Sequence, residues 1–228
     1  MDSLPSAVTS TSKPTAGTVR IWDLPTRIFH WLLVLLVGFS FVSAKVGSGW
    51  LQWHFYSGYT ILTLIVFRLL WGVAGSHYAR FATFLRGPRA IVSYVHSRAT
   101  VAGHNPLGAL AVLAFLLCLL VQGTTGLFAT DDIVSEGPLR QLISNSTADL
   151  LTRIHRWNEW VLIALIALHL SAVLYYLLAR RRNLIVPMLT GDQYVKEAVA
   201  ACDNAAMRIR AAVLFAVTIT LVAYVVNL

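Results

Sequence analysis

Five apolar runs, each long enough or nearly long enough to cross a bilayer, limit what this chain can fold into. They cover residues 28–44, 54–75, 107–129, 157–179 and 211–228. A helix of about 20 residues crosses ~30 Å of hydrocarbon. A composition of 57% hydrophobic and 12% charged residues, with a mean hydropathy of +0.68, also places the chain in the membrane class. We predict an all-α integral membrane protein, with a four-helix transmembrane bundle and a fifth, C-terminal transmembrane helix.

Local signals refine these boundaries. Pro25 suits a helix start, so the first helix extends back to about residue 25. The fourth helix is expected to begin near Ala148, with Asp149 in its first turn. Residues 1–18 are rich in Ser, Thr, Pro and Ala and have no signal-peptide core, which predicts a disordered tail. The chain then divides into a four-helix domain at 19–190 and a cytoplasmic linker with the fifth helix at 191–228.

The basic residues are concentrated on one side of the predicted membrane helices. Most Lys and Arg residues lie in the N-terminal segment and in alternate connections, at positions 13, 20, 27, 80, 86, 89, 98, 180–182, 196, 208 and 210. The other side has positions 45, 140, 153 and 156, together with acidic residues at 131, 132, 136 and 149. The positive-inside rule therefore predicts a cytoplasmic N-terminus. The net charge of +8 does not indicate nucleic acid binding, and the two cysteines match neither a disulfide framework nor a zinc site.

Four histidines stand in or beside these runs. His155 and His169 are fourteen residues apart, which puts them on one helix face about 21 Å apart along the axis. His30 and His54 lie near the starts of the first and second runs. With the predicted topology, His54 shares the outer half of the membrane with His155, and His30 shares the inner half with His169. The predicted depths of His30 and His169 agree less well, and helix tilt must make up the difference.

Neutral imidazoles inside an apolar bundle are suited to haem iron. Two axial imidazoles fill the coordination sphere of each iron, which favours electron transfer over oxygen binding. Two such sites at different depths would form an electron path across the membrane. Each histidine taken singly could instead be a hydrogen-bonded core residue or an interfacial residue, and the four together carry the haem interpretation.

Several sequence blocks resemble one family. They are IWDLPTRIFHW at 21–31, WHFYSG at 53–58, FRLLWG at 67–72, GHNPLG at 103–108 and RIHRW at 153–157. Over residues 19–190 the chain resembles the prokaryotic cytochrome b561 family, particularly its branch of b-type cytochrome subunits of nickel-iron hydrogenases. The resemblance implies two bis-histidine b haems, held by His30 with His169 and by His54 with His155. It also implies electron transfer between the quinone pool and a periplasmic or membrane-bound redox protein.

Other polar residues are secondary candidates. Arg68 lies fourteen residues after His54 and could pair with a haem propionate, or could snorkel to the cytoplasmic surface. Arg153 and Arg156 flank His155 and could bind propionates or be solvated loop cations. His104 competes with His30 as an inner ligand, although its place at a helix start favours a capping or quinone-adjacent role.

The leading hypothesis is a di-haem cytochrome b of the bacterial inner membrane that relays electrons between ubiquinone or menaquinone and a hydrogenase-like or cytochrome c-like partner. One alternative is a superoxide oxidase that passes electrons to ubiquinone, with outer arginines steering the anion. A second is a haem-free membrane anchor whose histidines bridge helices. The sequence leaves open whether the chain is itself an enzyme, and whether it forms a homodimer.

Overall fold

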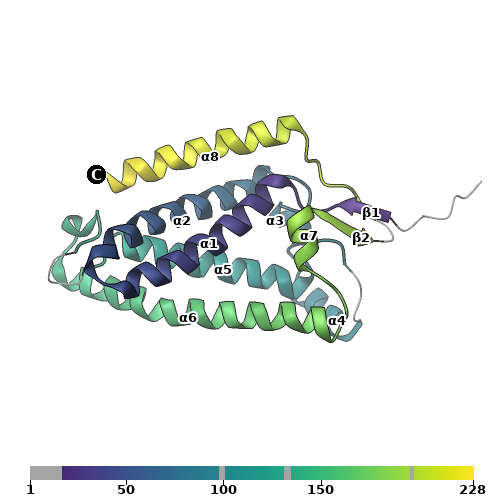
Figure 1. The fold of residues 1–228 in the computed structure, drawn as a ribbon, viewed down its shortest axis with the longest axis horizontal. Helices are drawn as coiled ribbons and strands as arrows, with labels where there is room; N and C mark the ends of the chain where they lie inside the picture. Colours follow the sequence, from purple (N-terminus) through teal and green to yellow (C-terminus); the bar gives the residue numbers. More distant parts are fainter. Residues whose placement is uncertain (1–16, 98–100, 131–134, 196–197) are drawn as a thin grey trace, which may run out of the picture.

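The computed structural model describes residues 17–97, 101–130, 135–195 and 198–228, and five long helices lie side by side in it (Figure 1). Each is long and apolar enough to cross a membrane. They are α1 (Leu24–Val46), α2 (Ser48–Ala74), α5 (Pro106–Gly126), α6 (Asn145–Leu178) and α8 (Ala205–Val226). The predicted all-α membrane fold is confirmed.

Short elements connect the long helices. The helical ones are α3 (Phe81–Phe84), α4 (Pro88–Ser97), the 3₁₀ turn η1 (Arg140–Leu142) and α7 (Ile185–Thr190). Two short strands, β1 (Gly17–Arg20) and β2 (Asp192–Val195), pair antiparallel, with Gly17 opposite Val195 and Arg20 opposite Asp192. Residues 17 and 18 therefore belong to a strand and not to the predicted tail, because a partner far along the chain supplies their hydrogen bonds. The rest of that tail lies outside the described residues.

Side-chain caps fix where the long helices begin. The Asp23 carboxylate accepts from the backbone N–H of Thr26 at 2.7 Å and starts α1, with Pro25 in its first turn as predicted. Ser144 caps α6 in the same way, so this helix begins at Asn145 and not near Ala148. Asp149 accordingly lies beyond the first turn. The missed signal was the hydroxyl of Ser144, four residues upstream of the expected start.

Helix α2 is the centre of the bundle. It packs against α1, α5 and α8, while α6 packs against α5. Two completely buried side chains of the core, Trp71 and Ile65, belong to α2. Gly47, with φ of +126°, forms the tight connection from α1 to α2, a conformation that favours glycine. In Figure 1, α8 lies along the outside of α2 and ends away from the strands, so the first described strand and the C-terminus lie at opposite ends.

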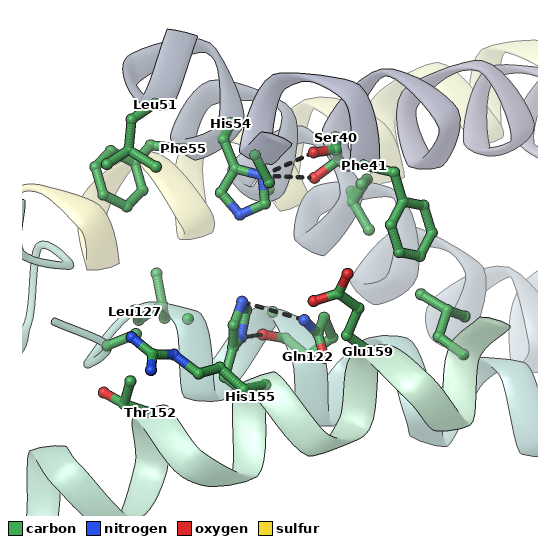
Figure 2. A pocket seen from close by; sticks show the side chains of 18 of the residues that line it. Ser40, Phe41, Leu51, His54, Phe55, Gln122, Leu127, Thr152, His155 and Glu159 are labelled. Carbon is green, nitrogen blue, oxygen red and sulfur yellow. Dashed lines mark hydrogen bonds between the residues drawn. The ribbon is translucent and has the colours of Figure 1, made fainter. Parts of the chain in front are cut away.

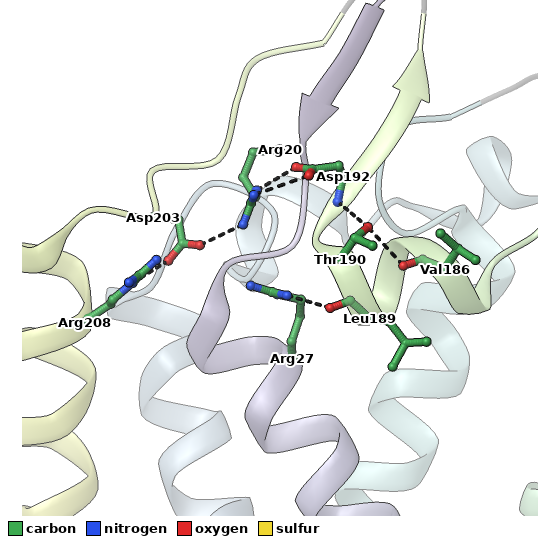
Figure 3. A network of polar contacts seen from close by, with 8 residues as sticks. All are labelled: Arg20, Arg27, Val186, Leu189, Thr190, Asp192, Asp203 and Arg208. Carbon is green, nitrogen blue, oxygen red and sulfur yellow. Dashed lines mark hydrogen bonds and ion pairs between the residues drawn. The ribbon is translucent and has the colours of Figure 1, made fainter.

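The end of the bundle with β1, β2 and α7, here called the sheet end, is held by a polar network (Figure 3). The Arg20 guanidinium donates to both carboxylate oxygens of Asp192, at 2.6 and 3.3 Å, and to Asp203 at 3.2 Å. Arg208, in the first turn of α8, donates to the other oxygen of Asp203. One arginine of β1 therefore joins this strand to β2 and to the segment that leads into α8.

The charge state of Asp203 follows from this network. Burial opposes its ionisation, but hydrogen bonds from Arg208 and the backbone N–H of Leu24, with the charges of Arg208 and Arg20, outweigh burial. The pKa of Asp203 consequently lies below its ordinary value. The carboxylate is ionised at neutral pH and keeps both arginines in place.

The arginines predicted to share one side of the membrane lie together at one end of the bundle. Arg20, Arg27, Arg80, Arg208 and Arg210 belong to elements at the sheet end, and Lys45 lies at the end of α1 beside Gly47. We call this second end the Gly47 end. Positions 13, 98, 131, 132 and 196 of the charge analysis lie outside the described residues.

Candidate functional site

A cavity of about 520 Å³ opens between α1, α2, α5 and α6 toward the Gly47 end (Figure 2). Its walls are mostly apolar, and they include Phe41, Phe55 and Leu127. His54 of α2 and His155 of α6 both line it. The structure therefore brings together the two histidines that topology assigned to the outer half of the membrane.

The two imidazoles point at each other across the cavity (Figure 2). Their ring centroids are 6.4 Å apart, and the ring planes are nearly perpendicular, at 89°. Two collinear metal–imidazole bonds of about 2.0–2.1 Å, with ring radii of about 1.2 Å, would place the centroids about 6–6.5 Å apart. The spacing of His54 and His155 thus suits one metal ion bound between them.

Hydrogen bonds decide which nitrogen of each ring faces the cavity. Nδ1 of His54 lies 3.0 Å from the carbonyl oxygen of Ser40, and Nδ1 of His155 lies 2.9 Å from that of Gln122. A carbonyl oxygen only accepts, so each neutral ring carries its proton on Nδ1 and donates it. Nε2 of each ring is left with a lone pair. A backbone carbonyl that orients an imidazole in this way is typical support for a metal ligand.

Glycines shape the wall beside His155. Gly58, Gly123 and Gly126 all line the cavity. A Cβ atom added at Gly126 would lie 3.0 Å from Cε1 and 3.3 Å from Nδ1 of His155. Glycine is common in membrane helices, so its presence at these positions does not by itself indicate a role. Only the packing of α5 against α6 shows that Gly126 makes room for the imidazole.

Charged residues surround the mouth of the cavity. Lys45 of α1 and Glu159 of α6 form an ion pair at 2.9 Å, and both line the cavity. Arg156 lines this cavity and also an adjoining polar pocket of about 330 Å³, where Arg153 lies as well. Both arginines that flank His155 in sequence are thus close to the cavity, with Arg156 nearer.

His30 and His169 come together less closely. The two residues are near enough for protonation of one to affect the other. His30 is half-buried on α1, whereas His169 is exposed on α6, with its ring edge-on to Phe115 at 5.7 Å. Among the described residues, the only two candidate ligands whose rings face each other as a pair are His54 and His155.

Arg68 is buried and does not snorkel to the surface. Its side chain belongs to α2, the residue is only 3% exposed, and its guanidinium carbon lies 5.1 Å from the Phe81 ring centroid. It interacts electrostatically with Asp23 and His104. The neighbouring carboxylate of Asp23 is already engaged by the backbone N–H of Thr26 and by the Trp71 indole at 3.2 Å.

His104 lies between two aromatic rings. Trp22 is 4.6 Å away and Phe84 is 4.5 Å away, measured between ring centroids. Burial, followed by the charges of Arg68 and His30, lowers the pKa of His104 to about 3, so its imidazole is neutral. The predicted capping role is wrong, because Asn105 caps α5 by accepting from the backbone N–H of Gly108.

Several polar atoms near the sheet end are buried without a hydrogen-bond partner among the described residues. Nδ1 of His30, Nη1 of Arg68 and Nδ1 of His104 are among them. Buried polar groups normally have partners, and a cluster of such exceptions calls for an explanation. A bound group with oxygen atoms would supply the missing acceptors.

The residues present fit haem. Two facing imidazoles with lone pairs, an apolar cavity and nearby arginines are what a bis-histidine haem with ionised propionates requires. Within the described part of the chain, no cluster of three or more His, Cys, Asp or Glu side chains could hold a bare metal ion. The donor set therefore favours a haem over a multi-ligand metal site.

Comparison with known proteins gives a consistent result. The family model described as prokaryotic cytochrome b561 matches residues 21–191. Two relatives named "Probable Ni/Fe-hydrogenase B-type cytochrome subunit" are similar to the chain, with 78% of this chain and 90% of each relative covered. The protein of Azotobacter chroococcum mcd 1 is 22% identical and that of Azotobacter vinelandii is 24% identical. No solved structure matches the chain.

Proposed function

Because the chain belongs to the prokaryotic cytochrome b561 family, we propose that it is a di-haem electron carrier between the quinone pool and a redox partner protein. Family membership and five apolar helices make it a multi-pass membrane cytochrome that binds haem b and transfers electrons. Beyond this, we propose how many haems the chain holds, which residues ligate them and which partners exchange electrons with it.

The facing pair His54 and His155 carries the proposal. Their centroid separation of 6.4 Å and their Nδ1 bonds to backbone carbonyls support one haem bound between α2 and α6. His30 and His169 would hold the second haem nearer the sheet end. The buried, unpartnered Nδ1 of His30 supports that assignment.

Arginines would stabilise the haem carboxylates. Arg68 offers a buried, unpartnered Nη1 at the sheet end, and Arg153 and Arg156 surround the other cavity. A charge-assisted hydrogen bond from arginine to a carboxylate is strong where water is excluded. The haem itself supplies one-electron chemistry when bound. The chain supplies ligands, an apolar surrounding and positive charge at each propionate.

The electron path would follow α6. His155 and His169 lie about 21 Å apart along this helix, so two haems ligated by them would lie at different depths. The excess of arginines at the sheet end favours placing it in the cytoplasm, with the Gly47 end on the periplasmic side of a bacterial inner membrane. The relatives named as hydrogenase subunits support a hydrogenase-like partner. Ubiquinone or menaquinone would be the membrane-soluble partner.

Superoxide oxidation is a second candidate. The polar pocket that adjoins the His54–His155 cavity holds Arg153 and Arg156, which could attract a small anion toward the haem. Asp149 lines the same pocket and weakens that field. The third candidate, a haem-free anchor, does not account for two imidazoles that face each other across an apolar cavity.

Haem quantitation tests the proposal. Purified wild-type protein should contain two b haems per chain by pyridine haemochrome assay, and His54→Ala and His169→Ala should each lose mainly one. Loss of neither haem would reject the ligand pairs, and colourless wild-type protein would favour the anchor. A reduced quinone such as decylquinol should reduce the haems. Protein that superoxide reduces promptly but quinol does not would favour superoxide oxidation.

A further inference from the structure

Polar side chains form a continuous chain between α5 and α6 that haem ligation alone does not require. Asn158 donates through Nδ2 to the carbonyl oxygen of Cys118 at 2.9 Å and to Oε1 of Gln122 at 2.6 Å. Nε2 of Gln122 lies 3.1 Å from Nε2 of His155. Polar groups in a membrane span are costly and usually serve a function.

The direction of every bond in this chain is fixed from its two ends. The Cys118 carbonyl only accepts, so the nearby atom of Asn158 is its amide nitrogen. That NH₂ group donates to Gln122, so the atom of Gln122 facing it is the oxygen. The NH₂ group of Gln122 then faces His155. At the other end, the Gln122 carbonyl holds the His155 proton on Nδ1 and leaves an acceptor on Nε2.

The geometry points to Gln122 as a positioning residue whose amide, oriented by Asn158, caps the lone pair of His155 Nε2 until iron takes its place. This inference rests on the proposed haem site. The amide donates to the one nitrogen that binds metal, and it excludes a proton from that nitrogen. On haem binding, His155 would give up a single hydrogen bond at Nε2, and its bond from Nδ1 to the Gln122 carbonyl would remain.

The opposite ligand is arranged differently. Nδ1 of His54 is near both the carbonyl and the hydroxyl of Ser40, at 3.0 and 3.1 Å. Both of these groups belong to α1 and act on Nδ1. The Gln122 amide acts on Nε2 of His155. A change at Gln122 should therefore affect one haem site through His155 and leave His54 as it is.

Two substitutions at Gln122 give opposite expectations. Gln122→Leu removes the cap but keeps the backbone carbonyl, so haem should enter this site about 2- to 10-fold faster, the equivalent of one net hydrogen bond. Gln122→Glu is nearly isosteric but places an acceptor against Nε2, which holds a proton there. This variant should lose one haem per chain. A general loss of packing would instead lower haem content in both variants.

The measurements separate this inference from the proposed function. Haem content and the rate of haem uptake are followed in both variants, with Gln52→Leu and Gln52→Glu as matched controls at an exposed position of α2. In haem-free protein, ¹⁵N NMR should show His155 unprotonated at Nε2 in wild type and protonated there in Gln122→Glu; His155→Gln assigns the signal.

Each outcome of these measurements supports or contradicts either the proposed function or the role of Gln122. Wild type without haem defeats the proposed function, and the NMR result still decides the role of Gln122. A wild-type His155 protonated at Nε2, or normal haem uptake by Gln122→Glu, overturns the inference. Opposite shifts in uptake for the two Gln122 variants, with both Gln52 controls at the wild-type rate, support it.

Discussion

Replacing Gly126 by alanine should weaken one haem site while leaving the fold intact. The added Cβ would lie 3.0 Å from Cε1 and 3.3 Å from Nδ1 of His155. Carbon contacts settle near 3.5–4.0 Å, so the ring must move by roughly half an ångström. Functional groups need to be held within about that distance of their working geometry.

The size of the effect follows from what the ring loses. Moving His155 stretches its 2.9 Å bond to the Gln122 carbonyl, which is worth about 1 kcal/mol. Displacing the side chain from its rotamer costs a further 0.5–1.5 kcal/mol, roughly. Since each 1.4 kcal/mol is about a factor of ten, one haem should be retained roughly 10- to 60-fold less tightly. Alanine is the better helix former by up to about 1 kcal/mol, so the bundle itself should not be destabilised.

Haem transfer to an excess of a haem-scavenging apoprotein measures retention, and thermal unfolding of the haem-free protein measures the fold. Gly38→Ala is the matched control, because a Cβ at this exposed position of α1 meets nothing within 4 Å. We expect biphasic haem loss in Gly126→Ala, with one phase accelerated, and wild-type behaviour in Gly38→Ala. Unchanged retention in Gly126→Ala would refute the assignment of His155 as a ligand packed against this glycine.

Three further outcomes are expected. Arg68→Gln should lower the midpoint potential of one haem by about 40–90 mV in a redox titration, since a cation ~10 Å away is worth about 1–2 kcal/mol at an effective dielectric constant of ~20. An unchanged potential would place Arg68 away from both haems. Because the pKa of Asp203 is lowered in the folded protein, its stabilising effect is complete above its unfolded pKa of about 3.9 and is lost below it. The melting temperature should therefore fall on acidification from about pH 5 to 3, and a slope in Asp203→Asn as steep as in wild type would contradict this. In a double-mutant cycle, Lys45 and Glu159 should couple by less than about 1 kcal/mol, because the Lys45 side chain is 69% exposed; a larger value would mean that this pair holds the cavity mouth closed.

Much of the site could be predicted because its signals are local. The apolar runs fixed five helices, and Asp23 followed by Pro25 fixed the start of the first one. Fourteen residues between His155 and His169 put both on one face, whatever the surroundings of α6. Alternation of the helices across the membrane then placed His54 level with His155, and the structure brings these two rings together.

Other features depend on which segments meet, and no local pattern shows this. Strands β1 and β2 pair residues that lie more than 170 positions apart, and the ion pair of Arg20 with Asp192 exists only because of that pairing. The burial of Arg68 depends on the helices packed around α2. From the sequence alone, a surface position was an equally good prediction for this charged residue.

The protonation of His155 separates most clearly what the sequence determines from what the packing determines. The sequence by itself predicted that these imidazoles belong to membrane-spanning helices and which of them share a level, since helical geometry requires only residue spacing. Which nitrogen of His155 carries the proton was decided by the Gln122 carbonyl and the Asn158 amide. Hydrogen bonds act over about 3 Å, and only the packing of α5 against α6 brings these groups within that range.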